Sequence, residues 1–231
     1  MYIFKLNHAL HRVRSVLLVS VIFSSSALAI RPMVTDDATL VDDCELETWW
    51  EYHKEAENAF WLVPSCRIAN IEWTVGHGHT SSSKPDILEL GARTELRTLT
   101  ANSWGATIGI AHETERSGGY KGSSHLNLAV SHSFMDDFIL LHKNIGYMNP
   151  RGDSNELTLA IAAELEWQPN HWIIAETFRE EAGRPYYQIG YRFEPLPDTL
   201  QLDASYGNRF YNKSDDQWLS IGMIWYFSLI N

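Results

Sequence analysis

The stretch from Asn155 to Trp167 constrains the fold of this chain most strongly, because its side chains alternate in character. A helix would place Glu164 and Glu166 about 200° apart, whereas a strand puts the two sets of side chains on opposite faces. The stretch is therefore predicted to be a β-strand. Its apolar residues are Leu157, Leu159, Ile161, Ala163, Leu165 and Trp167, and the small or charged residues between them are Thr158, Ala160, Ala162, Glu164 and Glu166.

The length of this alternation indicates a strand that spans a membrane. It covers thirteen residues, whereas strands of globular proteins usually have about five or six and a tilted transmembrane strand needs about 9 to 11. In such a strand the apolar face meets lipid and the small and charged face lines a lumen.

The same alternation recurs along the chain, and twelve segments between Cys44 and Ser228 show it. We therefore predict an all-β fold, a transmembrane antiparallel up-and-down β-barrel of about 12 strands. Short turns and longer polar loops alternate between the segments, so the short turns and both termini are expected on the periplasmic side. Aromatic residues beside the short turns should form an interface belt there: Trp104, Phe134, Phe138, Trp167, Trp172, Phe193, Trp225 and Phe227.

The beginning of the chain is predicted to be an export signal. Residues 1–29 combine a basic start, a short apolar run and a small-x-small site, so we expect cleavage after Ala29. Removing the three basic residues of this signal lowers the formal net charge from −11 to −14, which disfavours a nucleic-acid partner. Residues 30–43 have no sustained period and are predicted to be a periplasmic or lumenal lead-in, and residues 44–231 form the barrel.

The two cysteines of the chain, Cys44 and Cys66, are predicted to form a disulfide. Both lie eleven residues from a turn centred near Glu55, which makes them opposite partners in the first hairpin. Export delivers them to an oxidising compartment.

Two motifs near the start of the predicted barrel resemble a known family. Residues 31–38 read Arg-Pro-x-Val-Thr-Asp-Asp-Ala, and residues 44–49 read Cys-Glu-Leu-Glu-Thr-Trp. The combination resembles uncharacterised exported barrels related to the phenol-degradation (MetA-pathway) outer-membrane proteins. The specific match covers about residues 31–50. The resemblance implies an outer-membrane location and uptake of hydrophobic compounds, and it brings no catalytic residues.

Charged residues on the polar faces of the strands are predicted to line the lumen. A barrel interior is polar whether or not a solute passes, and opposite charges there can link neighbouring strands, so one interpretation is a structural network. The other is a selective passage, because twelve strands lie between the roughly eight that enclose a filled interior and the roughly sixteen that enclose a channel. These residues are Glu72, Glu89, Arg93, Glu95, Arg97, Glu113, His142, Glu164, Glu166, Glu176, Arg192 and Asp203.

Two histidine patterns near residue 80 suggest other chemistry. His77 and His79 share a strand face, but two imidazoles without a third ligand do not make a metal site, so neither a metal nor a cofactor is predicted. The spacing of His79 and Ser81 is similar to the His-x-Ser pattern of outer-membrane phospholipases. Ser81 begins a predicted loop and no orienting residue can be assigned, so no catalytic residue is predicted.

The favoured interpretation is an outer-membrane channel or uptake protein for small molecules, with hydrophobic cargo as the resemblance implies. The alternatives are a lipid hydrolase at the outer rim and a closed structural or binding barrel. The expected partners are outer-membrane lipid, small hydrophobic solutes and the barrel-insertion machinery.

Overall fold

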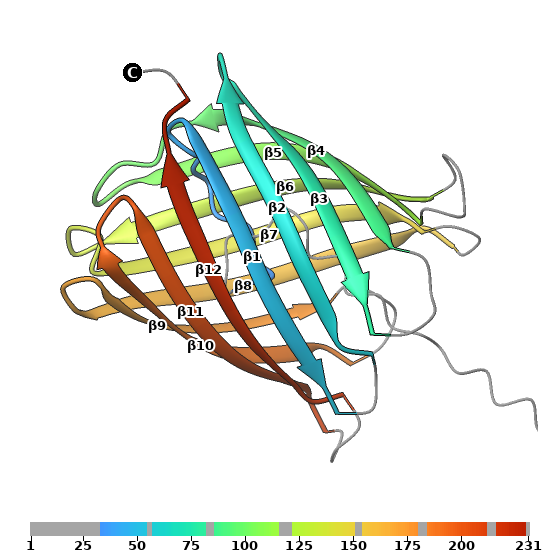
Figure 1. Ribbon diagram of the computed structural model, residues 1–231. Helices are drawn as coiled ribbons and strands as arrows, with labels where there is room; N and C mark the ends of the chain where they lie inside the picture. Colours follow the sequence, from blue (N-terminus) through green and yellow to red (C-terminus); the bar gives the residue numbers. More distant parts are fainter. Residues whose placement is uncertain are drawn as a thin grey trace, which may run out of the picture.

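Twelve strands of this chain close into one antiparallel barrel in the computed structural model (Figure 1). The structure describes residues 33–54, 57–81, 86–115, 122–150, 154–179, 184–211 and 216–229. The predicted signal peptide, with its cleavage site after Ala29, lies outside these residues. The strands are β1 (Cys44–His53), β2 (Ala59–Ile68), β3 (Ile71–Thr80), β4 (Ile87–Arg97), β5 (Trp104–Glu115), β6 (Gly122–Phe134), β7 (Ile139–Asn149), β8 (Glu156–Gln168), β9 (His171–Arg179), β10 (Tyr186–Leu196), β11 (Leu200–Arg209) and β12 (Trp218–Phe227).

Each strand pairs with its neighbours in sequence, and β1 pairs with β12 to close the ring. Closure satisfies the backbone donors and acceptors that an open sheet would leave at its edges. The prediction of a twelve-stranded up-and-down barrel is therefore confirmed. In the parts of the chain that the structure describes, no helix is long and apolar enough to cross a membrane.

The outer surface of the barrel is apolar because every second side chain of each strand points outward. Leu90, Ile110 and Ile221 are 56%, 59% and 63% exposed, whereas the intervening Glu89, Gly109 and Ser220 are buried. An apolar surface of this extent would be unfavourable in water, and lipid is the solvent that accommodates it.

The two ends of the barrel differ in their connections. Residues with positive φ gather in the short turns at one end, because tight reversals need the left-handed conformation: Ala69, Asn102, Met135, Asp136, Asp137, Asn170 and Asp198. β1 begins and β12 ends at this same end, so the first and last strand residues of the barrel lie beside the short turns (Figure 1). We call it the short-turn end, and the other the long-loop end.

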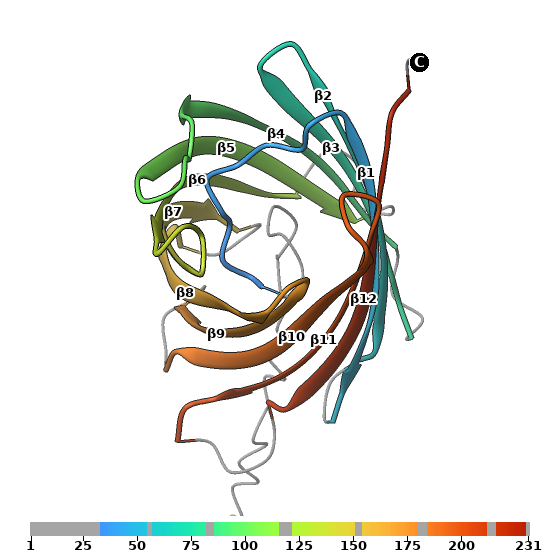
Figure 2. The same cartoon turned by 90° about the vertical axis from the view of Figure 1, so that its left-hand side faces the viewer.

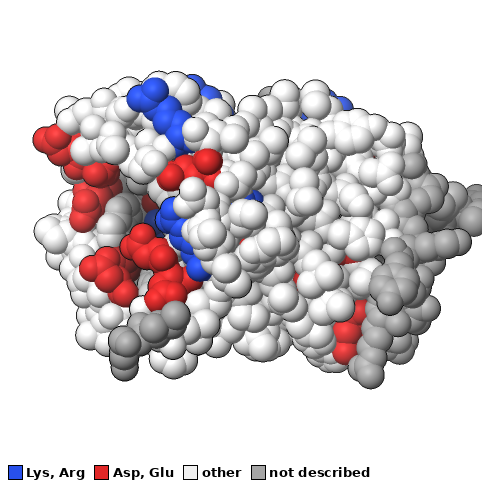
Figure 3. Space-filling view, turned by 90° about the horizontal axis from the view of Figure 1, so that it is seen from above, with Lys and Arg blue, Asp and Glu red and all other residues white. Residues whose placement is uncertain are grey.

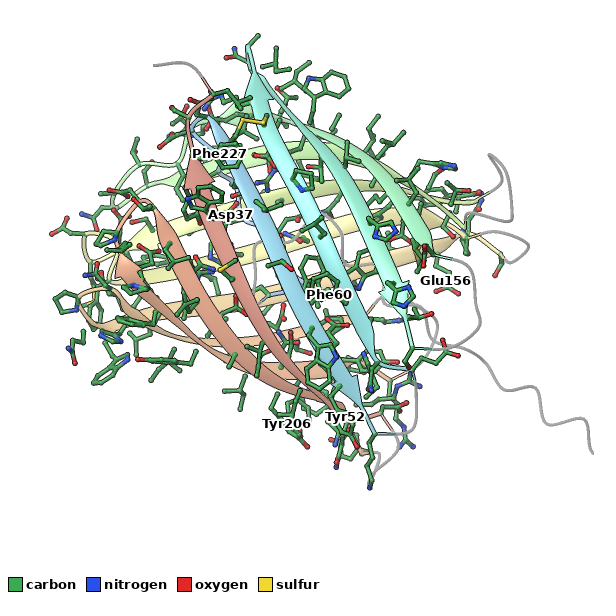
Figure 4. The ribbon with its side chains drawn as sticks, in the orientation of Figure 1. Asp37, Tyr52, Phe60, Glu156, Tyr206 and Phe227 are labelled. Carbon is green, nitrogen blue, oxygen red and sulfur yellow. A yellow bond between two sulfur atoms is a disulfide. The ribbon has the colours of Figure 1, made fainter. Side chains whose placement is uncertain are left out.

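Exposed aromatic side chains occur near both ends of the barrel. Figure 4 shows Tyr52 and Tyr206 toward the long-loop end and Phe227 near the short-turn end. Trp104, Phe134, Phe138, Trp167 and Trp225 are exposed, as expected of an interface belt. The expectation for Trp172 is wrong: it packs against the buried cluster of Met33, Ala162 and Ile174 inside the barrel. It occupies the same face of β9 as Ile174, and this face points into the lumen.

The predicted disulfide between Cys44 and Cys66 is confirmed. The two residues are directly opposite in the β1–β2 ladder, and Cys44 also pairs with Phe227 of β12. The bridge therefore joins the first hairpin beside the seam at which the barrel closes.

Replacing both cysteines with serine is expected to lower the free energy of unfolding by about 3 kcal/mol, because the bridge closes a loop over a sequence separation of 22 residues in the unfolded chain. Denaturant unfolding of wild-type and double-variant protein in detergent micelles measures the difference. Reductant should destabilise the wild type alone. Alkylation of both cysteines in unreduced, unfolded wild-type protein would show that the bridge is absent.

Candidate functional site: the barrel lumen and the segment inside it

The lead-in to the first strand lies inside the barrel. Figure 2 shows the chain before β1 running through the ring of strands. Met33, Thr35 and Ala38 are at most 1% exposed although they belong to no strand. We call residues 33–41 the lumenal segment.

Glu176 of β9 binds the start of the lumenal segment. Its carboxylate accepts hydrogen bonds from the backbone N–H groups of Val34 (2.9 Å) and Thr35 (2.9 Å) and from the Thr35 hydroxyl (2.7 Å). Hydrogen bonds to a charged acceptor are stronger than neutral ones. Met33 adds an apolar contact with Ala162 and Ile174 of the wall.

The middle of the lumenal segment bonds to β6 and β7. The backbone N–H of Asp36 donates to Asn144 (2.7 Å), whose amide donates back to the Asp36 carbonyl (2.8 Å). Asn127 donates to the Asp36 carboxylate, and the Ala38 N–H donates to the Ser131 hydroxyl (2.8 Å). The polar wall therefore takes the place of water for this stretch of irregular backbone.

Arg93 of β4 and its partner Glu72 bind the later residues of the lumenal segment. The guanidinium of Arg93 donates to Glu72 of β3 through Nε (2.7 Å) and Nη2 (3.0 Å), and its Nη1 lies 3.6 Å from Asp37. Glu72 in turn accepts a hydrogen bond from the Val41 N–H (2.8 Å). Arg93 and Glu72 are both buried, so this group joins two wall strands to the segment in a place with little water.

A second buried ion pair connects wall strands that are not neighbours. Arg192 of β10 donates to Glu164 of β8 at 2.7 Å, and His142 of β7 lies 3.3 Å from the same carboxylate. Ser131 is 2.7 Å from Nδ1 of His142 and is also the acceptor for Ala38, so the network extends to the lumenal segment.

Two glutamates face each other across neighbouring strands of the inner wall. Glu89 of β4 and Glu113 of β5 are directly opposite each other, and Gly76 of β3 is opposite Glu89 on its other side. A Cβ on Gly76 would come within 3.2 Å of the Glu89 Cβ, so the glycine leaves room for this carboxylate. Glu89 is 0% exposed, and neither of its carboxylate oxygens accepts a hydrogen bond from a donor in the described residues.

Aromatic side chains fill the lumen toward the long-loop end. Trp49 and Trp61 stack with ring centroids 5.6 Å apart, and Phe178, Tyr186 and Trp218 form a second cluster. Gly78 lies opposite Trp61 and Gly207 opposite Trp218. A Cβ on Gly207 would approach the Trp218 ring to 2.0 Å, so these glycines are the places where a flat indole can lie against the wall.

The predicted lumen residues divide into three groups. Glu72, Arg93, Glu164, His142, Arg192 and Glu176 belong to the bonded networks above, while Glu89, Glu113 and the buried Asp203 belong to other parts of the inner wall. Glu95 and Glu166 are half-buried near the short-turn end, where they accept hydrogen bonds from Thr98 and Asn170.

The prediction for Arg97 is wrong. Its guanidinium lies over the outward-facing ring of Trp104, 4.2 Å from the ring centroid. The ladder between β4 and β5 shifts register between Glu95 and Arg97. A β-bulge of this kind reverses the face of every residue beyond it, and alternation in sequence cannot show where it occurs.

His77 and His79 lie near the end of β3 at the long-loop end of the barrel. His79 Nδ1 lies 2.8 Å from Asp86, and His77 Nε2 lies 3.5 Å from the same residue. The hydrogen bond with His79 lowers the pKa of Asp86. Asp86 is thus an orienting residue that the sequence did not reveal. The Ser81 hydroxyl accepts from the Asn58 N–H, and no described contact joins it to His79. Among the described residues, no three His, Cys, Asp or Glu side chains are arranged to hold a metal ion.

The short-turn mouth of the barrel is hollow and acidic. A cavity of about 620 Å³ is lined by residues 39–45 together with Glu194, Asp198, Tyr226, Phe227 and Ser228. Figure 3 shows acidic side chains around a hollow at the left of the view, on the side of the short turns, with basic side chains beside them. The lumenal segment thus leaves the barrel through a negatively charged vestibule.

A family model matches residues 17–227, nearly the whole chain, under the description "Uncharacterised conserved protein UCP029691". The chain belongs to this family. The link to the phenol-degradation proteins stays a prediction. No curated protein matches the sequence of this UCP029691 member.

Solved porins and another outer-membrane protein share the fold of this UCP029691 family member. The KdgM porin has a TM-score of 0.64 and 13% identity over 79% of this chain and 99% of its own, and it has also been solved in complex with disordered oligogalacturonate. The NanC porin has a TM-score of 0.60 and 8% identity over 80% and 100%. Omp33 of Acinetobacter baumannii has a TM-score of 0.54 and 9% identity over 81% and 99%. At identities this low, the structural similarity shows a common barrel fold and nothing further.

Proposed function

We propose that this protein is an outer-membrane channel for small hydrophilic molecules and that its own lumenal segment closes it. The observation that carries the proposal is how the segment is held. It crosses a polar lumen and bonds to the wall through hydrogen bonds and one ion pair. Contacts of this kind can be exchanged for water when the segment moves, because water satisfies the same donors and acceptors.

The fold supports the proposed location and activity. KdgM, NanC and Omp33 are described as porins or outer-membrane proteins, and each is covered almost completely by the match. The complex of KdgM with disordered oligogalacturonate supports a small hydrophilic solute as the cargo of a barrel with this fold. Twelve strands enclose a lumen intermediate between a filled barrel and a wide pore.

The chemistry of the lumen favours hydrophilic cargo. The inner wall presents buried carboxylates, amides and hydroxyls from most strands. An apolar solute would have to desolvate these groups without bonding to them, which is unfavourable. The aromatic clusters toward the long-loop end are the feature that supports hydrophobic cargo, which the family resemblance implies.

Purified full-length protein in planar lipid bilayers tests the proposal. We expect discrete current steps in KCl, and swelling of protein-containing liposomes in a small neutral sugar. A mock preparation from the same host without the protein is the control for contaminating porins. If protein shown to be folded gives neither current nor swelling, the barrel is a closed structural or binding barrel instead.

The hydrolase alternative has weaker support. Asp86 orients His79 as a base would require, but the Ser81 hydroxyl bonds to Asn58 instead. A nucleophile must lie within hydrogen-bond reach of its base. Loss of lipid hydrolysis in a His79→Ala variant, with hydrolysis in the wild type, would be needed to favour the enzyme.

A further inference from the structure

By formal charge, the buried side chains of the barrel are strongly negative. Among the described residues, nine carboxylates are buried against two arginines, Arg93 and Arg192. The nine are Asp36, Glu45, Glu47, Glu51, Glu72, Glu89, Glu164, Glu176 and Asp203. A surplus of carboxylates enclosed by low-dielectric walls raises the local concentration of cations and excludes anions.

The two arginines leave little positive charge for an anionic solute. Arg93 is bonded to Glu72 and lies 3.6 Å from Asp37, and Arg192 is bonded to Glu164. Each guanidinium therefore faces at least one carboxylate of the wall or the lumenal segment. An anion entering the lumen would have to compete with these carboxylates for its contacts.

The surplus is concentrated around Glu89. Glu113 is directly opposite Glu89. Glu47 lies on the same row of the inner wall, because it is opposite Val63, and Val63 and Glu89 are both next to Gly76. Asp36 of the lumenal segment is held by Asn127 of β6, the strand next to β5. Both oxygens of Glu89 and Oδ1 of Asp36 are buried, and they accept no hydrogen bond within the described residues. Buried carboxylate oxygens are normally bonded, and two facing carboxylates can approach each other only when a proton or a cation lies between them.

We propose that Glu47, Glu89, Glu113 and Asp36 make the passage selective for small cations over anions. This inference rests on the proposed channel function. Rings of Asp and Glu side chains select cations in channels, and conduction requires that each ion binds weakly enough to leave.

Asp36 differs from the other three carboxylates because it belongs to the lumenal segment, which moves when the channel opens. Three of the four carboxylates belong to β1, β4 and β5, whereas Asp36 belongs to the lumenal segment, where Asn127 and Asn144 hold it. Movement of the segment would take Asp36 with it and leave the wall carboxylates behind. The glutamates are therefore expected to determine selectivity in the open barrel.

The test is the reversal potential of the full-length protein in a planar bilayer under a tenfold KCl gradient. For the wild type we expect a K⁺/Cl⁻ permeability ratio of about ten, at the low end of the enrichment that charged clefts produce. Glu89→Gln combined with Glu113→Gln should lower the ratio at least about threefold. The control is Asp136→Asn, which removes one carboxylate charge in an exposed turn outside the lumen.

The outcomes separate this inference from the function on which it rests. Folded protein that passes no current removes the channel function and the selectivity with it. Current with a ratio at or below one overturns the selectivity and leaves the channel in place. A ratio above one that changes equally in the double variant and in Asp136→Asn overturns the role of the two glutamates.

Discussion

Replacing Arg93 with Met is expected to lower the free energy of unfolding by about 3–5 kcal/mol, because breaking a buried ion pair leaves an uncompensated charge. Arg93 is 4% exposed and donates two hydrogen bonds to Glu72, which is 2% exposed. The variant would leave the buried carboxylate of Glu72 and the half-buried carboxylate of Asp37 without their shared cation. Denaturant unfolding in detergent micelles, followed by tryptophan fluorescence, measures the loss.

A second variant separates the ion pair from simple loss of packing. Arg93→Met combined with Glu72→Gln removes both members of the pair, and replacing both members of a buried pair is often close to neutral. The double variant should therefore recover much of the lost stability. If Arg93→Met alone unfolds with the wild-type midpoint, Arg93 must face water and not the buried network.

Replacing Glu176 with Ala is expected to raise the open probability of the channel about 10- to 100-fold. This carboxylate binds two N–H groups and one hydroxyl at the start of the lumenal segment. Losing a hydrogen bond to a charged group costs about 1.5–3 kcal/mol, and each 1.4 kcal/mol changes a population about tenfold. Single-channel recordings of the full chain give the open probability directly.

The matched control for this experiment is Glu166→Ala. Glu166 precedes the β8–β9 turn and accepts a hydrogen bond from the Asn170 N–H, and no hydrogen bond described above joins it to the lumenal segment. The variant removes the same charge from the same barrel, so it should leave the open probability close to the wild-type value. Equal open probabilities in Glu176→Ala and Glu166→Ala would show that the segment does not close the channel.

The barrel itself could be predicted from sequence because alternation is a local property. Strands such as β8 and β10 show their two faces directly in the order of their side chains, and the Cys44–Cys66 bridge follows from equal distances to a turn. Two failures have local causes that alternation hides. The bulge before Arg97 reverses its face. The position of Trp172 beside a short turn predicts an interface residue, whereas its side chain points into the lumen.

The lumenal segment could not be placed from sequence in the same way. Its residues have no period, because the segment crosses the lumen and bonds in turn to β9, β7, β6 and β3. The contact of Asp37 with Arg93 joins residues far apart in the chain, and no spacing rule predicts it. The lumenal aromatics carried a weak signal, since Trp61 and Trp218 each lie opposite a glycine on the next strand. That signal becomes readable only when the register is known.

The path of the lumenal segment has a consequence for how the molecule is assembled. From Thr35 to Val41 it bonds successively to β9, to β7 and β6, and finally to β3, none of which forms the β1–β12 seam. A finished barrel could admit the segment only by threading through its mouth, whereas a sheet that is still open can receive it sideways. We therefore expect the segment to bind the strands from β3 to β9 first, and β1 and β12 to pair last. The residues that close the channel would then also serve as an internal template around which the sheet closes into a barrel.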